Sequence, residues 1–207
     1  PPSLTVNDAT GNEDSAIALD IDASLVDPGE QLSILISNVP TGATLSHGTN
    51  QGDGAWLLSP VDLTGLTITP APGSDNDLSL LIEASSYDPL SGDTALISTS
   101  LHVTVDAVAD APTLNVSDAS GNENTSIALS IGALLNDTDG SESLSFLIEN
   151  VPAGATLSHG TDNHDGSWTL APVDLSGLTV APATNDASDF TLHVTATATD
   201  HGGSTAT

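Results

Sequence analysis

The chain contains two copies of one sequence, and this duplication limits its fold more than any other feature. The octapeptide Gly-Ala-Thr-Leu-Ser-His-Gly-Thr occurs at 42–49 and again at 154–161. The copies are offset by 110 residues before one acidic loop and by 112 after it, because Asp137-Thr-Asp-Gly-Ser-Glu142 replaces Asp27-Pro-Gly-Glu30. Each half of the chain must therefore adopt the same fold.

The duplication also sets the expected domain boundaries. We predict repeat 1 at residues 1–106, a linker at 107–111 and repeat 2 at 112–207. After its last acidic loop, repeat 1 continues from Thr94 to Asp106, whereas repeat 2 stops at Thr207, soon after Asp200. The last strand of repeat 2 is expected to be truncated, and the chain is expected to be a fragment of a longer array.

Short stretches of each repeat alternate apolar and polar residues, the pattern of strands with one buried face. The stretches of repeat 1 are Leu4/Val6, Ile17/Leu19/Ile21, Leu32/Ile34/Ile36, Leu78/Leu80/Ile82 and Leu101/Val103/Val105. Gly, Pro, Asp and Asn separate them, and no stretch has a convincing helical period. The pattern indicates an all-β chain of two tandem antiparallel β-sandwiches. Trp56 and Trp168 each follow an Asp-Gly turn and are expected to place one large ring in each core.

The charge of the chain excludes several kinds of partner. There are 28 acidic residues and no Lys or Arg, so no carboxylate can be neutralised by an ordinary salt bridge. Two carboxylates about 4 Å apart repel by about 1 kcal/mol in water and about 4 kcal/mol at an effective dielectric constant of 20. Nothing is available to neutralise the phosphates of nucleic acid or of an anionic membrane, and no long apolar run could insert into a membrane. Clustered acids would therefore need inorganic cations.

Strand directions predict that acids from distant loops meet where the repeats join. Counting strands from both ends of a module places the loops of Glu13 and Asp77 at the C-terminal end of repeat 1. The same count places the loops of Asp137 and Asp200 at the N-terminal end of repeat 2. The linker at 107–111 is therefore expected to bind calcium, and the expected metal ligands are Glu13, Asp75, Asp77, Asp106, Asp110, Asp137, Asp139, Glu142 and Asp200. This set favours Ca²⁺, which takes six to eight oxygen ligands, over Zn²⁺, which prefers His or Cys.

The repeats resemble the cadherin-like, immunoglobulin-like tandem extender repeats of large bacterial repeats-in-toxin adhesins, which are exported by type I secretion. The segments that carry the resemblance are Ala111-Pro112-Thr-Leu, Gly121-Asn-Glu123, Asn136-Asp-Thr-Asp-Gly140, Asp165-Gly-Ser-Trp168-Thr-Leu170 and Ala196-Thr-Ala-Thr-Asp200. The resemblance implies Greek-key modules placed end to end. It implies calcium ligands at Glu13, Asp106, Asp110, Asp137, Asp139 and Asp200, with Asp75 and Asp77 as loose counterparts of a further acidic motif.

These observations predict a mechanical, non-enzymatic function. The chain is expected to be a calcium-rigidified structural extender, or spacer, of a secreted adhesin on the bacterial cell surface, where it supports cell adhesion and biofilm formation. Its expected partners are calcium ions and neighbouring repeats of the same chain, and its distal ligand is unknown. One alternative is a calcium-dependent carbohydrate-binding or homophilic cell-binding module with a contact near Trp168 or His159. Another is halophilic adaptation, in which acids cover the surface without forming sites.

Catalysis is the function that the sequence favours least. Ser46-His47 and Ser158-His159 place a hydroxyl next to an imidazole in each repeat. A catalytic pair is recognised by geometry and not by adjacency, and alternation along a strand is expected to point neighbours to opposite faces. His102 and His193 alternate with apolar residues and are expected to face solvent.

Overall fold

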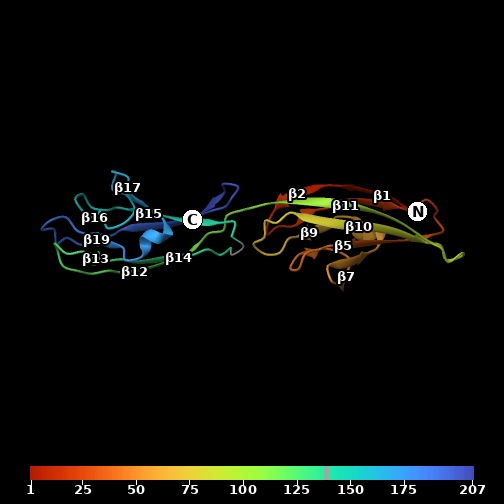
Figure 1. Cartoon of the computed structure of the whole chain (residues 1–207), viewed down its shortest axis with the longest axis horizontal. Helices are drawn as coiled ribbons and strands as arrows, with labels where there is room; N and C mark the ends of the chain where they lie inside the picture. The colour runs from red at the N-terminus through yellow and green to blue at the C-terminus, as the bar shows by residue number, and fades with distance from the viewer. Residues whose placement is uncertain (138–139) are drawn as a thin grey trace. The chain divides into compact units, whose positions relative to one another are not determined.

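The computed structural model describes residues 1–137 and 140–207. This part of the chain forms strands and two short 3-10 turns, divided between two compact units (Figure 1). Unit 1 spans Pro1–Ala107 and unit 2 spans Val108–Thr207. No helix in the described ranges is long and apolar enough to cross a membrane.

Unit 1 is a sandwich of two β-layers. Its elements are β1 (Ser3–Asn7), β2 (Ala9–Asn12), β3 (Ile17–Ala18), β4 (Asp20–Ser24), β5 (Gln31–Ser37), β6 (Thr44–Leu45), β7 (Thr49–Gly52), β8 (Ala55–Leu58), η1 (Pro60–Leu63), β9 (Thr67–Thr69), β10 (Leu78–Tyr87) and β11 (Thr94–Asp106). One layer has the order β2-β11-β10-β5-β8-β7. The other combines β1-β4 with β3-β9-β6, since β3 and β4 are successive parts of one strand interrupted at Leu19.

The strand order of unit 1 is that of an immunoglobulin-like Greek key. The first strand is split between the layers: β1 pairs antiparallel with β4, and β2 then pairs parallel with β11 in the other layer. The central pairs β10–β11, β10–β5 and β5–β8 are antiparallel. This division of early and late strands between two facing sheets is the sandwich arrangement that the alternating pattern predicts.

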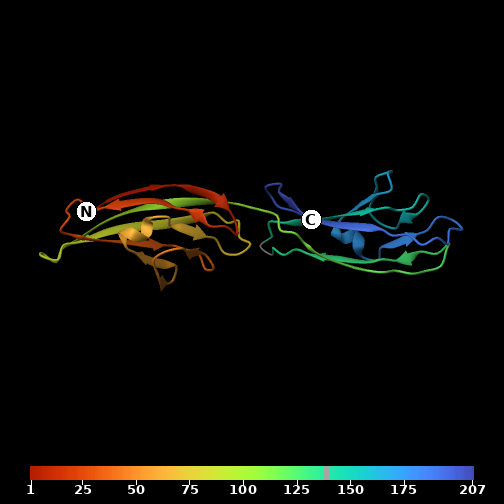
Figure 2. The ribbon, with the colours of Figure 1, turned by 180° about the vertical axis from the view of Figure 1, so that it is seen from behind.

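Unit 2 repeats this architecture in its own residues. Its elements are β12 (Thr113–Ser117), β13 (Ile127–Ala128), β14 (Ser130–Leu134), β15 (Ser143–Glu149), β16 (Thr156–Leu157), β17 (Thr161–Asp162), β18 (Trp168–Leu170), η2 (Pro172–Leu175), β19 (Thr179–Ala181), β20 (His193–Thr199) and β21 (Thr205–Ala206). One layer has the order β17-β18-β15-β20-β21, and the other combines β12-β14 with β13-β19-β16. Figure 2 shows these strands from behind, in green to blue.

Each unit has its own apolar core, built from the alternate residues that the sequence pattern marks. Ile34, Ile36, Leu80 and Ile82 are fully buried in unit 1, as is Ile148 in unit 2. The leucines between them, Leu35, Leu81 and Leu147, are less buried, and the polar His102 and His193 are exposed. The two tryptophans are half-buried and pack against the cores, so their rings lie less deep than the predicted core positions.

In each unit, the tight turn before β8 or β18 is hydrogen-bonded to the segment that follows β5 or β15. The N–H of Val39 donates to the carbonyl oxygen of Gly54 at 3.0 Å, and Val151 makes the matching bond to Gly166 at 2.9 Å. Both glycines have left-handed backbones, with φ of 73° and 86°. A Cβ atom would lie 2.5 Å from the Val39 oxygen at Gly54, but 3.5 Å from the Val151 oxygen at Gly166.

Candidate metal centre

The segment Ala109–Ala111 is fastened to the end of unit 2 by three hydrogen bonds. The N–H of Ala109 donates to Ser204 Oγ at 3.1 Å, and the N–H of Asp110 donates to Glu142 Oε1. Asn136 Nδ2 donates to the carbonyl oxygen of Ala111 at 2.7 Å. The segment therefore lies against the loops of unit 2 that contain Asn136, Glu142 and Ser204.

Three carboxylates are buried at this end of unit 2. Asp137, Glu142 and Asp200 are 7%, 9% and 5% exposed. Glu142 directly precedes β15 and Asp200 directly follows β20. These strands are antiparallel neighbours in which Ser143 pairs with Thr199, so both acids lie at the same end of the strand pair. Asp137 lies in the preceding loop and accepts a hydrogen bond from Ser141 Oγ at 3.0 Å.

The four acids of this end share one electrostatic environment. Burial raises the pKa of Glu142, and the hydrogen bond from the Asp110 N–H opposes that rise. The negative charges of Asp137, Asp110 and Asp200 raise the same pKa further. Since the sequence has no Lys or Arg, no salt bridge to either can offset this repulsion.

Two buried carboxylate oxygens at this end have no hydrogen-bond partner in the described part of the chain. They are Glu142 Oε2 and Asp200 Oδ2. A buried acceptor without a partner costs about 1–3 kcal/mol, and more if it is charged. The donor set is made of oxygen atoms and carries excess negative charge, so its chemistry fits a hard cation such as Ca²⁺. Within residues 1–137 and 140–207, no three His, Asp or Glu side chains already form a metal-ligand arrangement. The match to a hard cation therefore rests on the chemistry and the burial of the donor oxygens, and not on a ligand arrangement that is already formed among the described residues.

The remaining predicted ligand of unit 2 is Asp139, which lies outside the described residues. Serines that sequence reasoning missed also belong to this end: Ser141 bonds to Asp137, and Ser204 anchors the N–H of Ala109. Serine is common throughout the chain, so no sequence signal distinguishes these two from the others.

Hydrogen bonds link the segments that contain the four predicted ligands of unit 1. The N–H of Glu13, a residue only 4% exposed, donates to the carbonyl oxygen of Asp106 at 3.0 Å. Asp77 Oδ1 accepts a hydrogen bond from the N–H of Val105 at 3.0 Å. The loop of the half-buried Asp75 is tied to the Glu13 loop, because the N–H of Gly73 donates to Asp14 Oδ1 at 2.9 Å.

The acids at the other end of unit 1 have ordinary turn roles. Asp27 Oδ1 accepts the N–H of Gly29 at 2.9 Å. Asp88, the counterpart of Asp200, accepts the N–H of Leu90 and the hydroxyl of Ser91, and these bonds lower its pKa. Equivalent positions in the two repeats therefore differ in burial and in bonding.

The expectation that Ser46 and His47 point to opposite faces is wrong. Ser46 Oγ lies 3.0 Å from His47 Nδ1, and Ser158 Oγ lies 3.0 Å from His159 Nδ1. These residues follow two-residue strands, so strand alternation no longer governs them. All four are exposed, and each serine hydroxyl also accepts a backbone N–H from the neighbouring strand.

Comparisons with known proteins find similarity to solved structures at low sequence identity. No family model matches the chain, and no curated protein matches it. Among solved structures, the D00-D0 domain of intimin is 18% identical over 100% of this chain and 97% of that chain, with a TM-score of 0.31. Drosophila N-cadherin EC1-4 is 16% identical over 99% and 47%, with a TM-score of 0.37. Yersinia pseudotuberculosis adhesin InvE is 14% identical over 98% and 56%, with a TM-score of 0.31. The fold assignment rests on the strand order described above.

Proposed function

We propose that the chain is a calcium-dependent structural spacer of a secreted bacterial surface adhesin, without enzymatic activity. The observation that carries the proposal is the buried acidic end of unit 2. There, Glu142 Oε2 and Asp200 Oδ2 lack partners, and neighbouring charges raise the pKa of Glu142. The proposal accounts for both features with one cation.

Asp110, Asp137, Glu142 and Asp200 are the described residues that would hold the ion. Bound calcium would supply positive charge where no Lys or Arg is available to supply it. Glu142 has a second task, because its Oε1 holds the N–H of Asp110 and thereby positions the linker. Asp139 completes the proposed ligand set of this loop.

The spacer role extends the same proposal to the acids of unit 1. Asp106 and Asp110 are separated by only three residues, so they can be at most about 14 Å apart along an extended chain. We propose that Glu13, Asp75, Asp77 and Asp106 contribute ligands together with the acids of unit 2. Calcium would then hold the two units in one orientation, and its removal would leave the linker free to bend.

A calcium titration with a chelator control tests the proposal. We expect millimolar calcium to raise the melting temperature and chelator to reverse the rise. Chelator should also increase the particle dimensions that small-angle scattering measures. A ligand present at 100 times its Kd stabilises the folded state by about 2.7 kcal/mol, or roughly 10–20 °C for a domain of this size.

Matched variants separate specific binding from general charge effects. Asp110→Ala should weaken the response to calcium, whereas Asp62→Ala should leave it unchanged, because Asp62 caps η1 through Ser59. Sodium chloride at the same ionic strength should not replace calcium. A protein that responds to molar salt and ignores millimolar calcium would instead support halophilic adaptation.

A further inference from the structure

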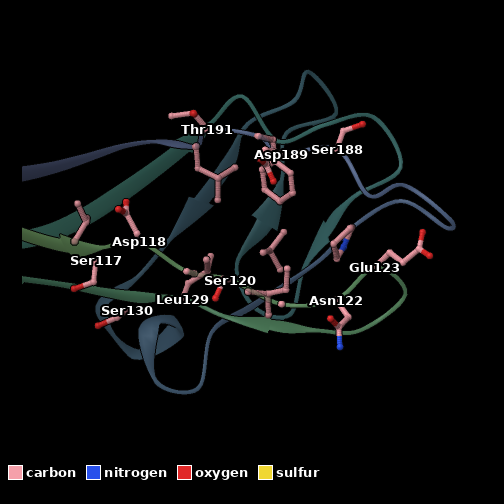
Figure 3. Close-up of a pocket in the computed structure, with 18 of the residues that line it drawn as sticks. Ser117, Asp118, Ser120, Asn122, Glu123, Leu129, Ser130, Ser188, Asp189 and Thr191 are labelled. Carbon is pink, nitrogen blue, oxygen red and sulfur yellow. The ribbon is translucent and has the colours of Figure 1, made fainter.

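Unit 2 has an open groove at the place where unit 1 has the strand β11. The groove has a volume of about 540 Å³ and lies between the layers of the sandwich (Figure 3). Its apolar lining includes Ile127, Leu129 and Ile131 from the β13–β14 segment, Phe190 and Leu192 from the segment before β20, and Val194 from β20. Unit 1, with the same fold, shows what covers these positions.

The corresponding side chains of unit 1 belong to one buried core cluster with three residues of β11. Leu101 and Val103 of that strand are fully buried and Val105 is 5% exposed. In the same cluster, Ile17, Leu19, Ile21, Leu78, Leu80 and Ile82 are all buried. In unit 2 the six counterparts are only half-buried. The open groove therefore corresponds to the space of three aliphatic side chains at alternate positions.

Backbone pairing differs in the same place. In unit 1, β11 pairs with β10 along Leu78–Tyr87 and with β2 along Ala9–Asn12. In unit 2, β21 pairs with β20 only at Ala198 and Thr199, and residues 119–122, the counterpart of β2, form no strand. The described chain thus leaves His193–Thr197 as a sheet edge, which is a template for a further strand.

Two carboxylates of the groove match carboxylates that hold β11 in unit 1. Asp8 Oδ1 accepts the N–H of His102 at 3.0 Å, and Asp77 Oδ1 accepts the N–H of Val105 at 3.0 Å. Their counterparts Asp118 and Asp189 line the groove and are labelled in Figure 3. The groove therefore offers acceptors for main-chain N–H groups as well as an apolar floor.

We propose that this groove binds one extended polypeptide strand with the pattern of β11, running antiparallel to β20 and parallel to residues 119–122. The backbone N–H and C=O groups along His193–Thr197 and the two carboxylates favour a polypeptide over a small apolar ligand. Main-chain hydrogen bonds and alternate side-chain pockets are the basis of strand addition. β21 sets the register, because Ala206 pairs with Ala198 as Ala95 pairs with Ser86 in unit 1. The proposal does not depend on calcium.

A labelled peptide with the sequence of residues 97–106 tests this proposal on the full chain. We expect saturable one-to-one binding by fluorescence anisotropy, in calcium and in chelator alike. Hydrogen exchange should slow at His193–Thr197 and at residues 119–122. A peptide with Ser in place of Leu101 and Val103 should bind at least tenfold more weakly, because it forfeits the burial of two aliphatic side chains.

Variants of the chain identify the polar contacts. Asp118→Ala and Asp189→Ala should each weaken peptide binding about tenfold, the effect of losing a hydrogen bond to a charged acceptor. Asp162→Ala removes the same charge outside the groove and should bind the peptide normally. Circular dichroism checks that each variant is folded.

A tethered form keeps the test decisive if the free peptide associates weakly. Residues 97–106 are copied after Thr207, with a scrambled copy as the control. The native copy should protect the same amides and raise the melting temperature of unit 2, and the scrambled copy should do neither. Equal behaviour of the two tethered chains would overturn the proposal. A concentration-dependent dimer that the peptide does not dissociate would also overturn it, in favour of a second copy as the occupant.

Discussion

The backbone N–H of Asp110 donates a hydrogen bond to Glu142 Oε1, which joins a linker residue to a buried carboxylate of unit 2. The other oxygen of that carboxylate, Oε2, is buried and lacks a hydrogen-bond partner among the described residues. One side chain therefore positions the linker and also offers a negative oxygen to the acidic centre. This double role makes Glu142 the most informative position to change.

Glu142→Gln removes the charge and keeps an oxygen that can accept the Asp110 N–H. We expect the variant to melt at a higher temperature than the wild type in chelator, because repulsion from Asp137 and Asp200 is reduced. We expect its calcium-dependent rise in melting temperature to be smaller by roughly 4–8 °C, which corresponds to about 1 kcal/mol in a domain of this size. Differential scanning calorimetry with and without calcium measures both effects.

Glu149→Gln is the matched control for this change, since Glu149 ends the strand that Glu142 precedes. It alters the net charge equally but lies at the opposite end of β15. An equal loss of calcium response in the two variants would show that net charge, and not the acidic centre, determines the effect.

The raised pKa of Glu142 predicts a pH dependence with a definite sign. In the calcium-free folded state this carboxyl holds its proton more tightly than in the unfolded chain, where its pKa is near 4.5. Its contribution to stability is therefore most favourable below that pH and is lost as the pH rises through the folded-state pKa. Urea unfolding in chelator should show the stability of the wild type falling relative to Glu142→Gln between about pH 4 and about pH 7. A constant difference across this range would contradict the prediction.

Much of the fold can be predicted from the sequence because alternation reports burial directly. Ile34 and Ile36 are buried as their spacing predicts, and the counted strand directions place Glu13 beside Asp106. The burial of the acidic loops could not be predicted in this way. Asp88 and Asp200 both begin turns after equivalent strands, but Asp88 is half-buried and accepts the N–H of Leu90, whereas Asp200 is buried and accepts the N–H of Ser204.

Local hydrogen bonds could not be predicted from the sequence pattern either. The contact between Ser46 and His47 depends on where β6 ends, and a two-residue strand leaves no pattern by which to locate its end. Ser204 is selected by its distance from the Ala109 N–H, a contact between residues far apart in the sequence. Such contacts are set by tertiary packing, which residue type alone does not encode.

Asp77 has a structural role that can be separated from any role in binding metal. Its Oδ1 accepts the N–H of Val105, so Asp77→Ala should destabilise unit 1 by about 1–3 kcal/mol even in chelator. Asp77→Asn keeps an acceptor oxygen and should recover most of this loss. Urea unfolding of both variants with and without calcium measures the two contributions. A loss confined to calcium-containing buffer would instead assign Asp77 to the metal alone.

The two equivalent turn glycines should differ in their tolerance of a side chain. Gly54→Ala and Gly166→Ala both place a Cβ on a left-handed backbone, which costs about 1–2 kcal/mol. Only at Gly54 would the new atom also lie 2.5 Å from a backbone oxygen, that of Val39, so the turn must shift and its Val39 hydrogen bond must weaken. We therefore expect Gly54→Ala to destabilise unit 1 more than Gly166→Ala destabilises unit 2. Native-state hydrogen exchange can follow each unit separately within one chain. Equal losses would mean that backbone strain alone sets the cost, and that the closer approach at Gly54 is relieved without loss of the Val39 bond.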